Sequence, residues 1–277
     1  MAQPDSLSLP EGPLLRALAS SSLSRRRAAM ASLSTFLSKK QNFTQLDFLK
    51  LWKGLFYCLY MTPKMLHQQR LSIEISGLTY TLRETPTMSQ EEQETEPKFL
   101  SFVRAFWTTI AREWEGIDKA RLDKFLFLVR RMVFVGFEGC KIPSSPEKGP
   151  EGYEWSPSLL RSYLDILKEG PLDAANIKLP VGLQLHVLDV LVDEMERADP
   201  GRQLDTQEVV GMLDGLKRES QTKTVRKKAG EVLQEGGLGD WAGAGRDTNG
   251  DGGDEQDGEE VEGEDEDEED GFEGFDD

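Results

Sequence analysis

Residues 99–135 read FLSFVRAFWTTIAREWEGIDKARLDKFLFLVRRMVFV and predict two helices joined by a tight corner. Apolar side chains recur along the first half at helical spacing and form one stripe: Phe99, Phe102, Val103, Phe106, Trp107, Ile110 and Trp114. Gly116 supplies a stop because glycine tolerates the left-handed turn after a helix, and Asp118 is a good N-cap for the next helix. The second helix is apolar on more than one side, so neighbouring helices are expected to pack around it.

The rest of the chain shows the same pattern of amphipathic helices separated by turn signals. Helices are expected over 13–38, from Thr44, with Asp47 as its capping-box partner, and from Thr62-Pro63 to about Leu82. Further helices are expected from Ser156-Pro157 to Gly170 and from Pro180. The last begins at Asp205 and has the basic segment 223–228 near its end. Loops are expected over 83–97 and 136–155, which are rich in turn residues or in glutamate. The sequence contains no convincing strand pattern.

This pattern predicts an all-α fold. Successive amphipathic helices joined by short turns favour stacked helical pairs, in the manner of HEAT repeats and other α-solenoids. An irregular helical bundle remains the alternative, because the sequence repeats are not regular. The helical domain is expected over 13–235, with a disordered start over 1–12 and a disordered tail over 236–277.

The net charge of −17 is concentrated at one end of the chain. Of the 50 acidic residues, 18 lie between Asp247 and Asp277, where lysine and arginine do not occur. The preceding part therefore holds 33 basic and 32 acidic residues and is nearly neutral. The acidic tail is a solvated segment that aids solubility, a binding segment for basic partners such as ribosomal proteins, or a screen against off-target RNA contact, and the sequence leaves all three readings open.

Residues suited to catalysis or metal binding are scarce. The chain has two cysteines and two histidines; Cys58 is expected to be a small buried side chain, Cys140 to lie in a loop, and His186 to be a structural histidine. The sequence contains no glycine-rich phosphate loop, no metal-ligand cluster and no nucleophile elbow. No stretch has the about 18 to 20 consecutive apolar residues of a membrane span. We therefore expect a protein that is not an enzyme, without cofactor, metal or small-molecule substrate.

The start of the tail contains a partial match to a calcium-binding loop. Asp247, Asn249, Asp251 and Gly252 fit the first half of an EF-hand loop, but its twelfth position is Gly258 in place of a bidentate glutamate. No amphipathic helix is expected on the tail side of this segment. A calcium-sensing EF-hand is therefore not predicted.

Several blocks of the sequence resemble one family. They are FWTTIAREWEGID at 106–118, RLDKF at 121–125, LWKGLFYCLYM at 51–61, the spacing of Pro180, Gly182, Leu183, His186, Asp189 and Glu194, and the basic segment 223–228. Together these blocks look like the ribosomal RNA-processing protein 1 family of eukaryotic nucleolar proteins. The resemblance covers roughly residues 14–230. It implies a nucleolar, non-catalytic factor for assembly of the large ribosomal subunit, with other assembly factors and pre-ribosomal RNA as partners.

Basic side chains near the resembling blocks are the candidate contacts with RNA or other partners. They are Lys53, Arg112, Arg121, Lys124, Arg130, Arg131, Lys223, Arg226, Lys227 and Lys228. A phosphate footprint requires such residues to converge on one face. The large aromatic residues of the same blocks are expected to be core rather than base-stacking platforms: Trp52, Phe56, Phe106, Trp107, Trp114 and Phe125.

Three other interpretations remain open at the level of sequence. Between Glu11 and Asp47 the chain is acid-poor and rich in serine and arginine, which is typical of a mitochondrial transit peptide, although Arg25 to Arg27 also resemble the family's first helix and are weak candidates for nuclear import. A general helical adaptor in the cytoplasm or a mitochondrion, without a ribosomal role, fits the same composition. A cryptic enzyme is the third interpretation, and the absence of a catalytic motif argues against it.

Overall fold

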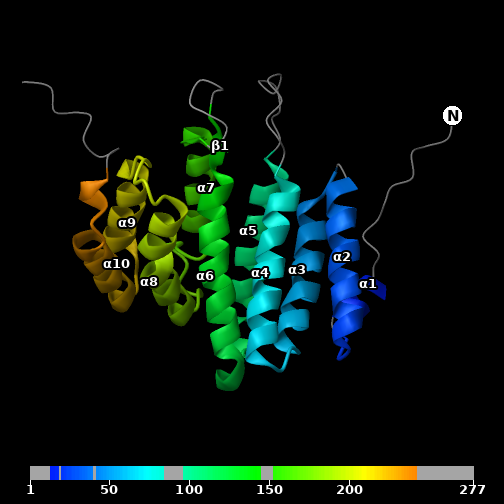
Figure 1. The fold of residues 1–277 in the computed structure, drawn as a ribbon. Coiled ribbons are helices and arrows are strands. Elements are labelled where there is room, and N and C mark those ends of the chain that lie inside the picture. Colours follow the sequence, from blue (N-terminus) through cyan, green and yellow to red (C-terminus); the bar gives the residue numbers. More distant parts are fainter. Residues whose placement is uncertain (1–12, 19, 40–41, 84–95, 145–151, 242–277) are drawn as a thin grey trace, which may run out of the picture. The chain divides into compact units, whose positions relative to one another are not determined.

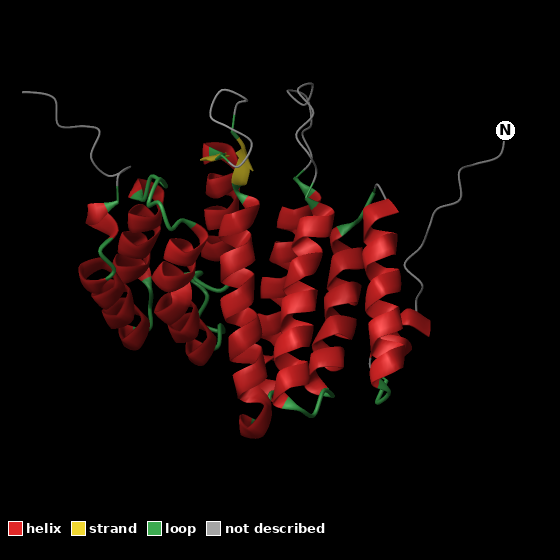
Figure 2. Cartoon of the chain, viewed as in Figure 1, coloured by secondary structure: helices red, strands yellow, loops and turns green. Residues whose placement is uncertain are grey.

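A computed structural model describes residues 13–18, 20–39, 42–83, 96–144 and 152–241 (Figures 1 and 2). Within these residues the chain forms α1 (Pro13–Leu18), α2 (Leu23–Lys39), α3 (Gln45–Tyr60), α4 (Met65–Leu82), α5 (Lys98–Glu113), α6 (Leu122–Gly139), α7 (Pro157–Glu169), α8 (Val181–Ala198), α9 (Gln207–Glu219) and α10 (Lys223–Glu235). The predicted disordered segment 1–12, residues 242–277 of the predicted disordered tail 236–277, the partial EF-hand motif and most of the expected loop over 83–97 lie outside the described residues.

The helices form two layers, and consecutive helices along the chain belong to opposite layers. The even layer consists of α2, α4, α6, α8 and α10, and each of these helices packs against the next one in that series. The odd layer consists of α1, α3, α5, α7 and α9, which are related in the same way. Figure 1 shows the helices side by side in chain order, from blue α1 to orange α10. The predicted all-α, HEAT-like arrangement is confirmed, with consecutive odd and even helices as the repeating pair.

Aromatic side chains from α3, α5 and α6 fill the centre of the stack. Trp52 is buried and its indole Nε1 donates a hydrogen bond to the Phe102 carbonyl at 2.8 Å. Its ring lies 4.6 Å from that of Phe102 and 4.9 Å from that of Phe106, measured between ring centroids. Phe56 stacks on Phe125 at 4.6 Å and so joins α3 to α6. Of the six aromatic residues expected in the core, five are buried and Trp114 is partly buried.

The corner between α5 and α6 is longer than a single capped turn. The 3₁₀ turns η1 (Trp114–Gly116) and η2 (Lys119–Arg121) separate the two helices. Asp118 precedes η2 but its side chain makes no capping hydrogen bond, which corrects the predicted N-cap. The Asp118 carboxylate instead accepts hydrogen bonds from the Tyr60 hydroxyl and from the Arg121 guanidinium.

The predicted loop over 136–155 begins too early and misses a hairpin. Helix α6 continues to Gly139 because Val135 and Phe137 extend its buried face. The strands β1 (Lys141–Pro143) and β2 (Tyr153–Trp155) then pair antiparallel, with Lys141 opposite Trp155, and correct the expectation of no strand. Cys140, expected in a loop, is buried at the end of α6, where its thiol donates to the Gly136 carbonyl at 3.3 Å.

Three other predicted boundaries also differ from the structure. Helix α4 begins at Met65 instead of Thr62-Pro63, because the Thr62 hydroxyl donates back to the Cys58 carbonyl at 2.8 Å. The basic segment 223–228 opens a separate helix, α10, instead of ending the one before it. Packing also continues beyond 235 through η4 (Leu238–Asp240) to Trp241, because Leu238 and Trp241 are apolar enough to be buried.

The corners of the first and last helical pairs are built alike. The guanidinium of Arg26 in α2 donates to the Ser20 carbonyl at 2.7 Å, and that of Arg226 in α10 donates to the Ser220 carbonyl at 2.7 Å. Arg226 reaches the C-cap residue of α9, where carbonyl groups lack a helical partner and the helix dipole is negative, and Arg26 reaches the equivalent turn just after α1. Residues 13–18 and 23–39 are thus integral parts of the stack, with Leu18 and Leu33 in its core.

Candidate nucleic-acid interface

The ten basic residues predicted as contacts do not form one surface. Lys53 lies on α3 and Arg112 at the end of α5, and three separate groups hold the rest: Arg121 and Lys124 at the start of α6, Arg130 and Arg131 in the middle of α6, and Lys223, Arg226, Lys227 and Lys228 on α10. Many of them have partners within the protein, so their exposure and bonding decide which can bind a polyanion.

Lys124 is a structural residue in this fold. Its side chain is only 5% exposed, and the ammonium donates to the Tyr60 carbonyl at 2.6 Å and to the Thr62 carbonyl at 3.1 Å. Burial lowers the pKa of Lys124 to about 8, and the neighbouring Arg121 contributes in the same direction. Lys124 therefore fastens the end of α3 to α6 and does not reach the surface as a phosphate contact.

Arg130 and Arg131 face different environments. Arg130 forms ion pairs with Asp193 at 3.2 Å and with Glu194, whose side chain is 0% exposed, so this arginine neutralises a buried carboxylate and joins α6 to α8. Arg131 places its guanidinium 4.9 Å from the ring centroid of Phe134. The Nε of Arg131 is buried and has no hydrogen-bond partner among the described residues.

The remaining predicted residues are mostly engaged as well. Arg112 pairs with Glu113 at 2.8 Å, and Arg121 pairs with Asp118 while lying 4.6 Å from the Tyr60 ring centroid. On α10, Lys228 pairs with Asp189 of α8, Lys227 lies 3.4 Å from Glu231, and Arg226 caps α9 as described above. Lys53 and Lys223 are exposed without an ion pair among the described residues.

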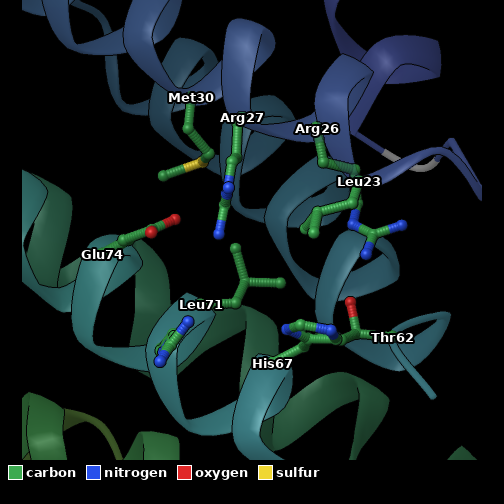
Figure 3. A pocket seen from close by; sticks show the side chains of 9 residues that line it. Leu23, Arg26, Arg27, Met30, Thr62, His67, Leu71 and Glu74 are labelled. Carbon is green, nitrogen blue, oxygen red and sulfur yellow. The ribbon is translucent and has the colours of Figure 1, made fainter. Parts of the chain in front are cut away.

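A basic pocket between α2 and α4 joins residues that the sequence did not group as one site (Figure 3). It is lined by Leu23, Arg26, Arg27, Met30, Thr62, His67, Arg70, Leu71 and Glu74. Arg27 and Arg70 are exposed and make no ion pair within the described residues, whereas Arg26 is buried and bonded to the Ser20 and Ser21 carbonyls. The only sequence signal is the arginine run 25–27, because the α4 residues lie far away in the chain.

His186 is partly buried, and Cys58 and Cys140 are buried. His186 lies with its Nε2 2.9 Å from the Leu126 carbonyl, and burial lowers its pKa. Burial raises the pKa of the Cys58 thiol to about 12 and that of Cys140 as well, so neither sulfur is an effective nucleophile near neutral pH. Within the described ranges no three His, Cys, Asp or Glu side chains form a potential metal site, and no helix could cross a bilayer.

Comparison with known proteins decides the family. Residues 10–273 match the model of the nucleolar protein family Nop52, which is nearly the whole chain. The chain belongs to this family. The predicted resemblance is thereby confirmed.

Named relatives of this Nop52-family chain come from distant eukaryotes. It is 30% identical over 202 residues to human ribosomal RNA processing protein 1 homolog B, covering 71% of the chain and 24% of that protein. Identity to mouse ribosomal RNA processing protein 1 homolog A is 30% over 193 residues, or 68% of the chain and 35% of that protein. The Dictyostelium discoideum homolog is 28% identical over 207 residues, with 72% and 39% covered. The Nop52-family chain thus spans well under half the length of these relatives.

Proposed function

We propose that this chain is a non-catalytic factor of ribosomal RNA processing, which acts in the nucleolus on precursors of the large ribosomal subunit. The match of residues 10–273 to a nucleolar protein family carries this proposal, and the names of the relatives, which refer to ribosomal RNA processing, support it. The structure supports a scaffold: two layers of helices expose long surfaces for partners, while the thiols and His186 lie in settings unsuited to catalysis. A helical adaptor without a ribosomal role is the alternative.

The partners follow from the same proposal. Other assembly factors would dock on the helical layers, pre-ribosomal RNA would contact basic side chains, and basic ribosomal proteins would bind the acidic residues beyond Asp247. The two kinds of surface adjoin on α4, because the exposed Arg70 lies four residues after Leu66 and three before Ile73.

Depletion of the protein in its own cells tests the ribosomal role. We expect precursors of the large subunit to accumulate or disappear on RNA blots, while small-subunit precursors change little and the tagged protein sediments with large-subunit precursors. A helical adaptor predicts normal precursors and normal subunit ratios, so that result would contradict the proposal. Re-expression of the wild-type chain is the control, and it should restore the precursor pattern.

For contact with RNA, the structure favours exposed cations that lack internal partners. We assign this role to Arg27 and Arg70 at the pocket between α2 and α4, with Lys53 and Lys223 as further candidates. Lys124 and Arg130 are left out, since carbonyl groups and carboxylates inside the fold already hold them. Arg112, Arg121, Arg131, Arg226, Lys227 and Lys228 rank behind the first group because each has a carboxylate, carbonyl or ring partner.

Replacing both Arg27 and Arg70 with alanine is expected to weaken RNA binding and its dependence on salt. Each lost phosphate contact reduces the slope of log Kobs against log salt by about 0.7 for single-stranded RNA, so the double variant should lose about 1.4. Fluorescence anisotropy with a labelled single-stranded RNA over a salt series measures the slope. The double variant Arg161→Ala/Lys168→Ala removes two exposed charges on α7 and should change the slope little. Equal slopes for both double variants would reject the assignment.

A further inference from the structure

Helix α4 carries an exposed apolar stripe on the outer side of the even layer. Leu66, Ile73 and Tyr80 are 67%, 48% and 45% exposed, and they follow one another at heptad spacing. Residues at this spacing lie on one face of a helix, and three of them span about 21 Å. Large apolar side chains exposed singly are ordinary, but three in a row on one helix face, with Arg70 between the first two and Gly77 between the last two, indicate a surface that another molecule covers.

Gly77 leaves open space between the Ile73 and Tyr80 side chains of this stripe. It lies on the same face, four residues after Ile73 and three before Tyr80, and a Cβ atom placed there would meet nothing within 4 Å. Glycine inside a helix weakens it by about 1 kcal/mol relative to alanine. Space above a glycine between two apolar side chains allows the backbone or a side chain of a partner helix to approach closely. We call Leu66, Ile73, Gly77 and Tyr80 the α4 stripe.

Arginines from α6 and α8 extend the α4 stripe on one side. The guanidiniums of Arg131 and Arg197 lie 4.9 Å and 5.2 Å from the ring centroid of the partly buried Phe134. Helix α6, which carries Arg131, packs directly against α4. Burial raises the pKa of Tyr80, Glu138 acts in the same direction, and Arg131 and Arg83 act against it. The stacked arginines have only weak internal pairing, since Arg197 is 3.6 Å from Glu194 and the Nε of Arg131 lacks a hydrogen bond within the described residues.

The apolar side chains of this face favour a protein partner, whereas Arg70, on the side of the stripe toward α2, is the candidate RNA contact. Leucine and isoleucine at heptad spacing match the apolar positions of a second helix, whereas binding of single-stranded RNA uses a series of exposed aromatic platforms. Here Tyr80 is exposed and Phe134 is partly covered by its two arginines. Cationic side chains along one edge complement a helix with acidic residues beside its apolar stripe.

We propose that the α4 stripe, with Arg131 and Arg197 at its edge, is the docking surface for an amphipathic helix of a partner protein. The partner helix has apolar residues at i, i+3 or i+4, and i+7, and acidic residues on the flank that faces α6 and α8. This inference goes beyond the proposed function and does not depend on which particle the chain joins.

Site-specific photo-crosslinking in cells tests the docking surface. The full chain is expressed with a photoreactive phenylalanine analogue in place of Ile73, and the crosslinked peptides are identified by mass spectrometry. The same analogue at Thr108, an exposed position on α5 of the odd layer, is the matched control. We expect Ile73 to capture peptides that have the apolar spacing and acidic flank described above, and Thr108 not to capture them.

Second variants separate docking from folding. In the chain with the analogue at Ile73, Arg131→Glu together with Arg197→Glu should reduce the yield of these crosslinks at least tenfold. Leu66→Asp should do the same without altering an arginine, because this side chain is 67% exposed and the change leaves the core intact. Crosslinks from Ile73 to RNA alone, to the chain's own residues 242–277, or to peptides without the acidic amphipathic pattern would overturn the proposal. A yield at Ile73 no higher than at Thr108 would overturn it too.

Discussion

Replacing Trp52 with alanine is expected to lower the free energy of unfolding by about 3–5 kcal/mol, the range for removal of a large buried aromatic side chain. Trp52 is 1% exposed, packs against the rings of Phe102 and Phe106, and bonds to the Phe102 carbonyl. Alanine would leave a cavity between α3 and α5 that rigid neighbouring helices cannot close. Urea denaturation of residues 1–277 followed by circular dichroism measures the loss as a lower midpoint at unchanged slope.

Two control variants test whether the loss of stability comes from the buried ring of Trp52. Trp52→Phe keeps most of the ring contact and loses the hydrogen bond, so it should cost clearly less than alanine. Tyr57→Ala on the same helix removes a side chain that is 43% exposed and should change stability by less than about 1 kcal/mol. If Trp52→Ala were as mild as Tyr57→Ala, the aromatic centre would not be what holds α3 to α5.

Replacing Gly136 with alanine is expected to destabilise the fold by about 3 kcal/mol, near the upper end of the usual range for overpacking a core. A Cβ atom at Gly136 would lie 2.2 to 2.5 Å from atoms at the end of the Tyr163 ring. Tyr163 is fully buried and its hydroxyl donates to the Val133 carbonyl at 3.2 Å, so the ring cannot move aside without losing both packing and this bond. Denaturation of the variant, compared with wild type, measures the effect.

A second glycine supplies the matched control for Gly136. Gly77→Ala adds the same methyl group to a helix where nothing lies within 4 Å, and it should stabilise the chain by up to about 1 kcal/mol. Combining Gly136→Ala with Tyr163→Leu should cost less than the sum of the two changes, because the smaller side chain makes room for the methyl group. Strict additivity, or a neutral Gly136→Ala, would show that α6 and α7 approach less closely than described.

Local signals in the sequence were sufficient for most helices and insufficient for their ends. The capping box of Thr44 and Asp47 and the Ser156 cap were predicted from residue types alone and are confirmed, because these bonds involve residues only a few positions apart. Gly136 was counted as a loop residue, because its reason for being glycine is the Tyr163 ring of another helix. The division into odd and even layers follows from contacts between distant segments, which periodicity within one helix does not report.

The candidate interface was harder to predict, because it also depends on contacts between segments that lie far apart in the sequence. Lys124 and Arg226 look like free cations in the sequence, and only the folded chain shows that they cap the ends of α3 and α9. Arg27 and Arg70 come together across two helices that no sequence pattern connects. Charge alone therefore overestimates the binding surface, because part of it neutralises helix ends within the fold.

The two layers respond differently to a load applied from one side. Neighbouring pairs hold the stack together through a series of interfaces, so small rotations at successive interfaces add along its length. A partner that draws α4, α6 and α8 closer together shortens the even layer relative to the odd layer and bends the stack toward itself. Because that bending is divided among successive interfaces, a small rotation at each one would let the chain fit partners of different radius.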